Sequence, residues 1–298
     1  GLLRSRDHLL ATKAIFGAAF TVITQWLPRW GITCDWLDTD TANSQEHVRP
    51  NTKMLFIETP SNPGLDIIDL EAAGRFAKRN NLIFNVDNCF ATPYLQQPAR
   101  FGADLITHSS TKFLDGQGRV LGGIGAGRAD LLVDIKKFCR STGPSLSPFN
   151  AWLLSKSLET LAVRLDRHCD NALALAKYLS AHDQVQMVRY PFLDSHPAAA
   201  IARKQMKNGG GLVTFEVKGG LEQGRRFLDA LQMLSLSANL GDTRSIATHP
   251  ASTTHAKMTA DDRKAAGISD GLIRISAGLE HIDDIIEDID NALKISRV

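Results

Sequence analysis

Reactive side chains stand at the ends of two apolar runs in the first half of the sequence. One run leads into the carboxylate of Asp87, and the next leads through Ser109 and Thr111 to the amine of Lys112. Each run has the length and composition of a buried strand. The carboxyl ends of parallel strands meet at one edge of an open α/β sheet, where such folds bind ligands. We therefore expect these side chains to lie together.

A lysine and a carboxylate in this arrangement fit one cofactor chemistry. The amine of Lys112 can form a Schiff base with the aldehyde of pyridoxal phosphate, and Asp87 can keep the ring nitrogen protonated, so that the ring accepts electrons. Ser109 and Thr111 are close enough in the chain to bind its phosphate. Taken singly, each residue could have a purely structural role, with Lys112 on the surface and Asp87 only ending a strand. The combination favours pyridoxal phosphate.

Composition limits the other classes of function. The chain has 298 residues, of which 43% are hydrophobic, and a formal net charge of +2, so it can bury a core in one large or two medium domains and gives no electrostatic reason to expect nucleic acid or a membrane as partner. Four cysteines occur without any C-x-x-C pair, and no apolar stretch approaches the roughly 20 residues that span a bilayer. We expect a cytoplasmic protein with small-molecule partners.

Strands and helices are expected to alternate up to Lys112. Apolar residues at helical spacing predict an amphipathic helix over 16–30, and buried strands are expected at 32–38 and 53–60. A turn at 60–64 precedes a helix that Asp66 or Asp69 could cap and that extends to Asn80. This order implies parallel strands joined by right-handed crossovers. The glycine-rich residues 116–127 lack the G-x-G-x-x-G spacing of a dinucleotide site and predict a turn and a small-residue strand.

The second half has its own α+β pattern. One long helix is expected over 149–181. Strands are expected at 185–190, 211–217 and 272–276, and further helices at 221–231 and 282–293. The long helix could link two domains. We expect a large domain over residues 1–160 and a smaller α+β domain over 161–298.

A few residues of the second half required a choice between a ligand and a structural role. Arg274 interrupts an apolar strand, and a buried guanidinium needs a partner, either an internal carboxylate or a carboxylate ligand. His249 and His255 have no acidic third ligand at regular spacing, and His168 is expected to be packed in its helix. We therefore expect no metal site.

Four segments together resemble the Cys/Met-metabolism family of pyridoxal-phosphate enzymes, and the similarity extends over essentially the whole chain. They occur in the family's order, at residues 58–63, 86–88, 108–112 and 271–280. The resemblance implies the type I aminotransferase-like fold, with a mostly parallel large domain and a smaller α+β C-terminal domain. It also implies pyridoxal phosphate as cofactor.

The resemblance carries roles over to single positions. It implies that Lys112 forms the Schiff base, that Asp87 binds the ring nitrogen, and that Ser109 and Thr111 hold the phosphate. Phe16 stands where many members stack a tyrosine on the ring.

On the substrate side, the resemblance places Asn62 near the ring hydroxyl and the substrate. Asn239 is a further candidate for substrate binding. Arg274 matches the arginine that binds the α-carboxylate, which favours a ligand over an internal salt bridge.

Among the subfamilies, residues 112–119, 143–150 and 238–243 look most like O-succinylhomoserine sulfhydrylases. These enzymes convert O-succinylhomoserine and sulfide to homocysteine and succinate in methionine biosynthesis. The γ-lyases that release methanethiol usually carry Tyr-Gly-Cys where this chain has Phe16, Gly17 and Ala18. Cystathionine γ-synthase and the γ-lyases stay open as alternatives.

The sequence departs from the family's pattern at its start. Members have a preceding segment with a glycine-containing phosphate loop and a Tyr-x-Arg pair that serves the neighbouring subunit, and this chain begins after both. We expect the sequence to be part of a longer one, and a non-catalytic binding module is the alternative from another class. The resemblance implies a homotetramer built from dimers that share active sites.

Overall fold

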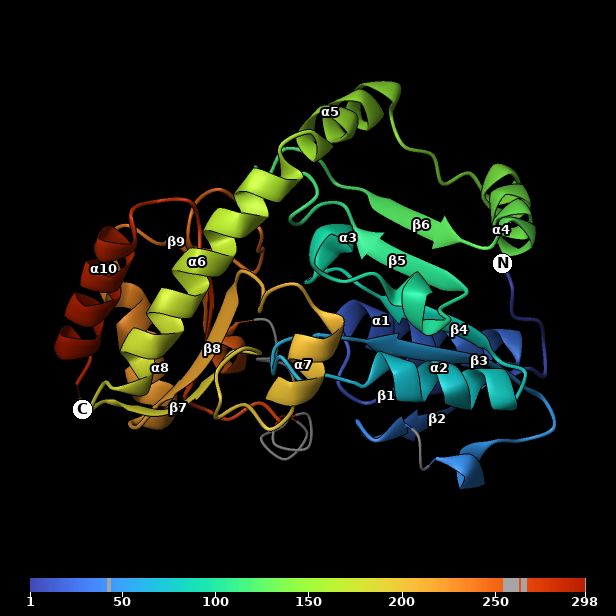
Figure 1. Ribbon diagram of the computed structural model, residues 1–298, viewed down its shortest axis with the longest axis horizontal. Helices are drawn as coiled ribbons and strands as arrows, with labels where there is room; N and C mark the ends of the chain where they lie inside the picture. Colours follow the sequence, from blue (N-terminus) through green and yellow to red (C-terminus); the bar gives the residue numbers. More distant parts are fainter. Residues whose placement is uncertain (42–43, 254–262, 264–266, 298) are drawn as a thin grey trace.

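The computed structural model describes residues 1–41, 44–253, 263 and 267–297. It contains two sheets that lie side by side, with the long helix α6 (Leu161–Ser180) running diagonally past the smaller one (Figure 1). The first sheet is built from residues 8–127 and the second from residues 185–276. No helix in the described part of the chain is both long and apolar enough to cross a membrane.

The first sheet has six strands in the order β2-β1-β3-β4-β5-β6. All neighbouring pairs are parallel except β5 and β6, which are antiparallel. The expected parallel sheet is therefore confirmed. The strands in chain order are β1 (His8–Thr12), β2 (Thr33–Leu37), β3 (Thr52–Glu58), β4 (Ile83–Asp87), β5 (Leu105–Ser109) and β6 (Gly123–Gly127).

Helix α2 (Leu70–Arg79) shows how local sequence sets this architecture. Asp69 Oδ1 accepts the N–H of Ala72 at 3.0 Å and so begins the helix. Gly74 allows close packing, since a Cβ there would lie 1.9 Å from the carbonyl oxygen of Phe101. The apolar face of the helix joins side chains of β1, β3 and β4 in one buried cluster, which includes Leu10, Leu55, Ile57, Phe76 and Phe84.

The second sheet has five strands in the order β7-β8-β11-β10-β9 and is mostly antiparallel. Its strands are β7 (Val185–Arg189), β8 (Leu212–Val217), β9 (Ser235–Leu236), β10 (Ile246–Thr248) and β11 (Leu272–Ser276). Helices α6, α8 (Gly220–Ala230) and α10 (Ile282–Ile295) pack with it around a second apolar core. The remaining α-helices are α1 (Gly17–Thr21), α3 (Thr92–Leu95), α4 (Ala129–Thr142), α5 (Pro148–Leu158) and α7 (Ala199–Gln205).

Two predicted helices differ from the structure. The segment 16–30 is helical but not one regular helix, because α1 continues into a π-helical turn at Val22–Trp26 and a 3₁₀ turn at Leu27–Trp30. Ile23 is buried, but most of the large side chains are not, and Trp30 is 59% exposed. The predicted helix over 149–181 is interrupted at Glu159 and Thr160, which divides it into α5 and α6.

This interruption lies at the expected boundary between the domains. Helix α5 and helix α4 extend along the upper side of the first sheet, whereas α6 packs on the second (Figure 1). A division into residues 1–160 and 161–298 stays a proposal, supported by the separate sheets and their separate apolar cores.

Candidate active site

The carboxyl ends of β3, β4 and β5 bring polar side chains to one edge of the first sheet. The strands are parallel, and the register places Glu58 beside Asp87. Ser109 ends β5 and precedes the turn that carries Lys112. The sequence prediction that Asp87, Ser109 and Lys112 stand at neighbouring strand ends is therefore confirmed as geometry.

Lys112 lies half-buried and contacts the C-terminal part of the chain. Its Nζ donates to Oδ1 of Asn239 at 2.6 Å. Burial lowers the pKa of the Lys112 amine, and the guanidinium of Arg274 contributes in the same direction. A lowered pKa makes this amine a better nucleophile and base near neutral pH than an exposed lysine.

Arg274 lies on β11 and is 4% exposed. Its Nη1 donates to Oδ1 of Asn62 at 2.9 Å, while Nη2 donates to the main-chain oxygens of Ala238 and Asn239 at 3.1 and 3.2 Å. No carboxylate lies within salt-bridge distance of it in the described part of the chain, so the alternative of an internal ion pair is not what the structure has. Burial lowers its pKa to about 10, and its positive charge is left for a ligand.

The two hydroxyls expected at the phosphate differ in their partners. The hydroxyl of Ser109 forms no hydrogen bond with the residues that the structure describes. Thr111 Oγ1 accepts the N–H of Gly122 at 3.0 Å and donates to the main-chain oxygen of Gly122 at 3.4 Å. Ser109 is thus free to bind an anion, whereas Thr111 is already partly engaged with the loop before β6.

Phe16 and Asn62 are held at this edge by hydrogen bonds to Glu58, a residue for which the sequence predicted no role. The carboxyl of Glu58 accepts the N–H of Phe16 at 2.7 Å, and the N–H of Asn62 also points to it. Phe16 itself is 49% exposed. The sequence signal for Glu58 was its place as the acid that ends a buried strand, which is the same signal that identified Asp87.

The histidines considered as metal ligands have structural partners where they are described. His168 Nδ1 contacts the main-chain oxygen of Ala277 at 2.6 Å, and His249 contacts Ser252 Oγ and the oxygen of Asp270. His255 lies outside the described residues. In the part of the chain that is described, no group of three His, Cys, Asp or Glu could hold a metal ion.

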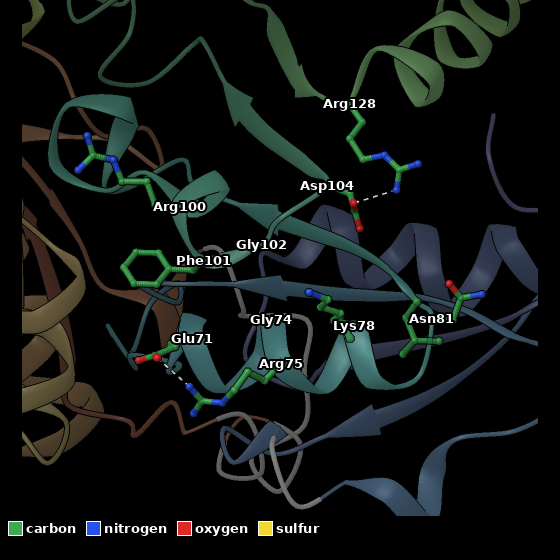
Figure 2. Close-up of a pocket in the computed structure, with 12 residues that line it drawn as sticks. Glu71, Gly74, Arg75, Lys78, Asn81, Arg100, Phe101, Gly102, Asp104 and Arg128 are labelled. Carbon is green, nitrogen blue, oxygen red and sulfur yellow. Dashed lines mark hydrogen bonds and ion pairs between the residues drawn. The ribbon is translucent and has the colours of Figure 1, made fainter.

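A groove of about 690 Å³ lies at the opposite edge of the sheet (Figure 2). Asn81 and Asp104 line it just before β4 and β5 begin, so it lies at the amino ends of these strands. Its basic side chains are partly paired within the chain, through Arg75 with Glu71 and Arg128 with Asp104. None of the candidate site residues lines it.

The side chains at the carboxyl edge fit pyridoxal phosphate. They offer an amine of lowered pKa in Lys112, a carboxyl in Asp87 with no cation within 4.0 Å among the described residues, and an unpartnered hydroxyl in Ser109. These are the groups that the aldehyde, the protonated ring nitrogen and the phosphate require. Which of them contacts which part of the cofactor remains the prediction made from the sequence.

Comparison with known proteins gives consistent relatives. The chain is 43% identical over 293 residues to the O-succinylhomoserine sulfhydrylase of Pseudomonas aeruginosa, which covers 98% of this chain and 73% of the relative. It is 40% identical over 297 residues to the L-methionine gamma-lyase of Fusobacterium nucleatum, covering 98% of this chain and 75% of that enzyme.

Solved structures with the same fold include metB of Corynebacterium glutamicum, with a TM-score of 0.93 and 35% identity over 98% of this chain and 76% of the other. The structure of cystathionine gamma-lyase from Lactobacillus plantarum matches with a TM-score of 0.94 and 33% identity, over 99% of this chain and 77% of that one. The expected type I fold of pyridoxal-phosphate enzymes is therefore confirmed. The family model for Cys/Met metabolism PLP-dependent enzymes matches residues 1–294. The chain belongs to this family, and its cofactor is pyridoxal phosphate.

Proposed function

We propose that the protein catalyses a γ-replacement, in which O-succinylhomoserine and sulfide give homocysteine and succinate for methionine biosynthesis. The observation that carries the proposal is the position of Asn239, whose side chain accepts from Lys112 and whose main-chain oxygen accepts from Arg274. One residue thus sets the spacing between the reacting amine and the proposed carboxylate site. The sulfhydrylase of P. aeruginosa at 43% identity supports this choice.

Arg274 and Asn62 orient the substrate in this proposal. The guanidinium binds the α-carboxylate in a two-point fork, because no internal carboxylate among the described residues competes for it. Asn62 Oδ1 accepts from Arg274 and holds the fork in place. Arg274 also donates to the main-chain oxygen of Asn239, whose side chain accepts from Lys112.

Lys112 and Asp87 perform the proton chemistry. When bound, pyridoxal phosphate supplies a ring that accepts the electrons of the bond broken at the substrate's Cα. Asp87 holds the proton on the ring nitrogen. Lys112 Nζ removes a proton from Cα and then one from Cβ, so that succinate leaves Cγ with the electron pair of its bond. Hydrosulfide then bonds to Cγ, and Lys112 returns protons to Cβ and Cα.

The residue over the ring also bears on the choice of reaction. Phe16 offers a flat apolar face without a phenol, so it can stack but cannot donate a proton. Lys112 is then the proton carrier throughout. Ser109 and Thr111 are proposed to bind the phosphate, with Ser109 the stronger donor because its hydroxyl has no partner within the described structure.

A γ-lyase is the second candidate, because an L-methionine gamma-lyase is 40% identical over 297 residues. Product analysis separates the two activities. With O-succinylhomoserine and sulfide, our proposal predicts homocysteine and succinate in equal amounts. Methanethiol from L-methionine alone, at a higher kcat/KM than the replacement, would contradict it. Cystathionine as the main product when cysteine competes with sulfide would instead indicate a cystathionine γ-synthase.

We further propose that the protein forms a homotetramer. Large apolar side chains are exposed on α1, α5 and the turn after α1, among them Phe20, Trp30, Phe149 and Trp152 at 45 to 65%. Such a concentration of exposed aromatics indicates a surface that another subunit covers. Light scattering on the purified protein should give four times the mass of the chain, and a monomer would contradict this.

We also place its activity in the cytoplasm. All four cysteines are free, and Cys169, on α6, is buried in the core. Unpaired thiols persist in a reducing compartment. Cell fractionation with an antibody against the protein would test this placement.

A further inference from the structure

Two carboxyl groups stand side by side at the proposed cofactor site. Glu58 ends β3, Asp87 ends β4, and the register of the parallel strands pairs these two positions. Paired positions on neighbouring strands direct their side chains to the same face of the sheet. Glu58 is 4% exposed, whereas Asp87 keeps some contact with solvent.

Neither acid has a cation of its own. No lysine, arginine or histidine nitrogen lies within 4.0 Å of either carboxyl in the described part of the chain. The titratable groups that face the pair are Cys89, whose pKa burial raises, and Lys112 beyond it. Two neighbouring carboxylates that are largely buried and have no cation beside them do not both ionise readily, so the pair should hold a proton.

Burial indicates which acid holds this proton. The charged form costs most where solvent is excluded most completely, which is at Glu58. Burial and the neighbouring Asp87 both raise the pKa of Glu58 well above its ordinary value, whereas burial raises the pKa of Asp87 only to about 6. Asp87 also accepts the N–H of Cys89 at 3.0 Å, which stabilises its charge.

Glu58 also connects two segments of the site. Its Oε2 accepts the N–H of Phe16 at 2.7 Å, and the N–H of Asn62 points to the same carboxyl. Phe16 is the residue proposed to stack on the cofactor ring, and Asn62 is proposed to lie at the ring hydroxyl. The position of Glu58 therefore fixes the chain on two sides of the ring.

We infer that Glu58 is a positioning residue that keeps the proton of the Glu58–Asp87 pair, so that one negative charge remains, on Asp87, to meet the positively charged ring nitrogen of the cofactor. This rests on the proposed role of Asp87. If both acids were ionised, the two carboxylates would repel each other. If both were protonated, the ring nitrogen would have no counter-ion. One proton on the deeper acid satisfies both requirements.

Infrared spectroscopy tests where the proton lies without any assay of activity. The protein, loaded with pyridoxal phosphate and also free of it, should show the carbonyl stretch of a protonated carboxylic acid at neutral pH. Glu58→Gln should remove this band, and Asp87→Asn should leave it. A spectrum of the wild-type protein without such a band at neutral pH would overturn the inference even if no variant folds.

Cofactor affinity tests the positioning role. Glutamine has the shape of a protonated glutamate, so Glu58→Gln should bind pyridoxal phosphate less than about tenfold more weakly than the wild-type protein. Glu58→Ala leaves two N–H groups without their acceptor and should bind about 30-fold more weakly or worse. Glu222→Gln, an exposed acid on α8, is the control and should bind as the wild-type protein does.

The outcomes separate the inference from the assignment on which it rests. Equal losses in Glu58→Gln and Glu58→Ala would mean that Glu58 acts as an anion, and unchanged binding in both would mean that it has no role. Either result overturns the inference. Unchanged binding in Asp87→Asn would instead show that Asp87 is not the partner of the ring nitrogen, and the proposed site would fail with it.

Discussion

The acids at the candidate site differ from two other buried acids of the chain, Asp115 and Asp242, in what surrounds them. Asp115 is fully buried and has Arg119 at 3.0 Å, and Asp242 is paired with Arg244 at 3.2 Å. Glu58 and Asp87 have no such cation among the described residues. Asp115 and Asp242 thus have a counter-ion within the same chain, whereas the pair at the strand ends needs a positive charge from a ligand.

The hydrogen bonds around the two kinds of acid differ in the same way. Asp115 accepts N–H groups of Arg119 and Val120 and so closes the loop that follows Lys112. Glu58 binds the N–H of Phe16, in a segment with exposed aromatic side chains. The first arrangement stabilises the fold, and the second shapes a surface that a cofactor can cover. Four experiments test this distinction.

The largest effect on activity should come from Lys112→Ala. Loss of the amine that carries protons should reduce turnover by about 10³-fold or more, because general acid-base transfer alone contributes about 10² to 10⁴. The free energy of unfolding should change little, since among the described residues the amine forms a hydrogen bond only with Asn239. Turnover of O-succinylhomoserine with sulfide is the measurement. Lys78→Ala, in the groove at the opposite edge of the sheet, should keep full activity.

Asp115→Asn should have the converse effect, on stability. Buried N–H groups would lose their charged acceptor, and we expect the free energy of unfolding to fall by about 2–4 kcal/mol. Urea denaturation measures this change. Glu58→Gln should cost less than about 1 kcal/mol in the cofactor-free protein, because the amide replaces a neutral acid. An equal loss in both variants would remove the distinction between the two kinds of acid.

Arg274→Lys tests whether the buried arginine serves the substrate. Lysine keeps the charge but cannot form the two-point fork, so KM for O-succinylhomoserine should rise by about 10- to 100-fold. Its kcat should fall much less. Arg226→Lys on the exposed face of α8 is the matched control. An unchanged KM in Arg274→Lys would show that the α-carboxylate binds elsewhere.

The pH dependence of stability should have opposite signs for the two kinds of acid. The pKa of Asp87 is raised by burial to about 6, against about 3.9 in an unfolded chain, so the folded state binds the proton more tightly. Its contribution therefore falls as the pH rises from about 4 to about 6. Burial acts to raise the pKa of Asp242 as well, but hydrogen bonds from Arg244 outweigh it and lower the pKa. Its contribution is present above about pH 4 and is lost as the pH falls.

Unfolding of the cofactor-free protein measures both slopes, above about pH 4 for Asp87 and below about pH 4 for Asp242. Asp87→Asn should remove a decline in stability with rising pH, and Asp242→Asn should remove a gain. Slopes of the same sign for the two variants would contradict the account of their surroundings.

The sequence predicted the parallel sheet and the neighbouring strand ends because both depend on local patterns. Strand periodicity located Asp87 and Lys112, and the order of elements implied that they share an edge. The strand pattern alone left the role of Arg274 open, because a buried guanidinium can pair either with an internal carboxylate or with a carboxylate ligand. The family resemblance favoured a ligand, and the fold supports it, because Arg274 on β11 lies beside Asn62 with no carboxylate within salt-bridge distance in the described part of the chain.

The missed features have physical reasons as well. Glu58 was overlooked because its importance depends on register with Asp87, and register between strands separated by a helix is not visible in one sequence. The segment 16–30 has the periodicity of an amphipathic helix, yet its apolar side chains stay largely exposed. Periodicity identifies an apolar face but not whether the same chain covers it. The interruption at Glu159 and Thr160 could not be predicted, because no proline or glycine occurs there.

The most direct test of the central claim is to find the site of the cofactor. The protein is incubated with pyridoxal phosphate, reduced with borohydride and digested, and the peptides are analysed by mass spectrometry. The account predicts a phosphopyridoxyl group on Lys112 and its absence from that position in Asp87→Asn at low cofactor concentration. Labelling of another lysine, with Lys112 unmodified, would contradict the account.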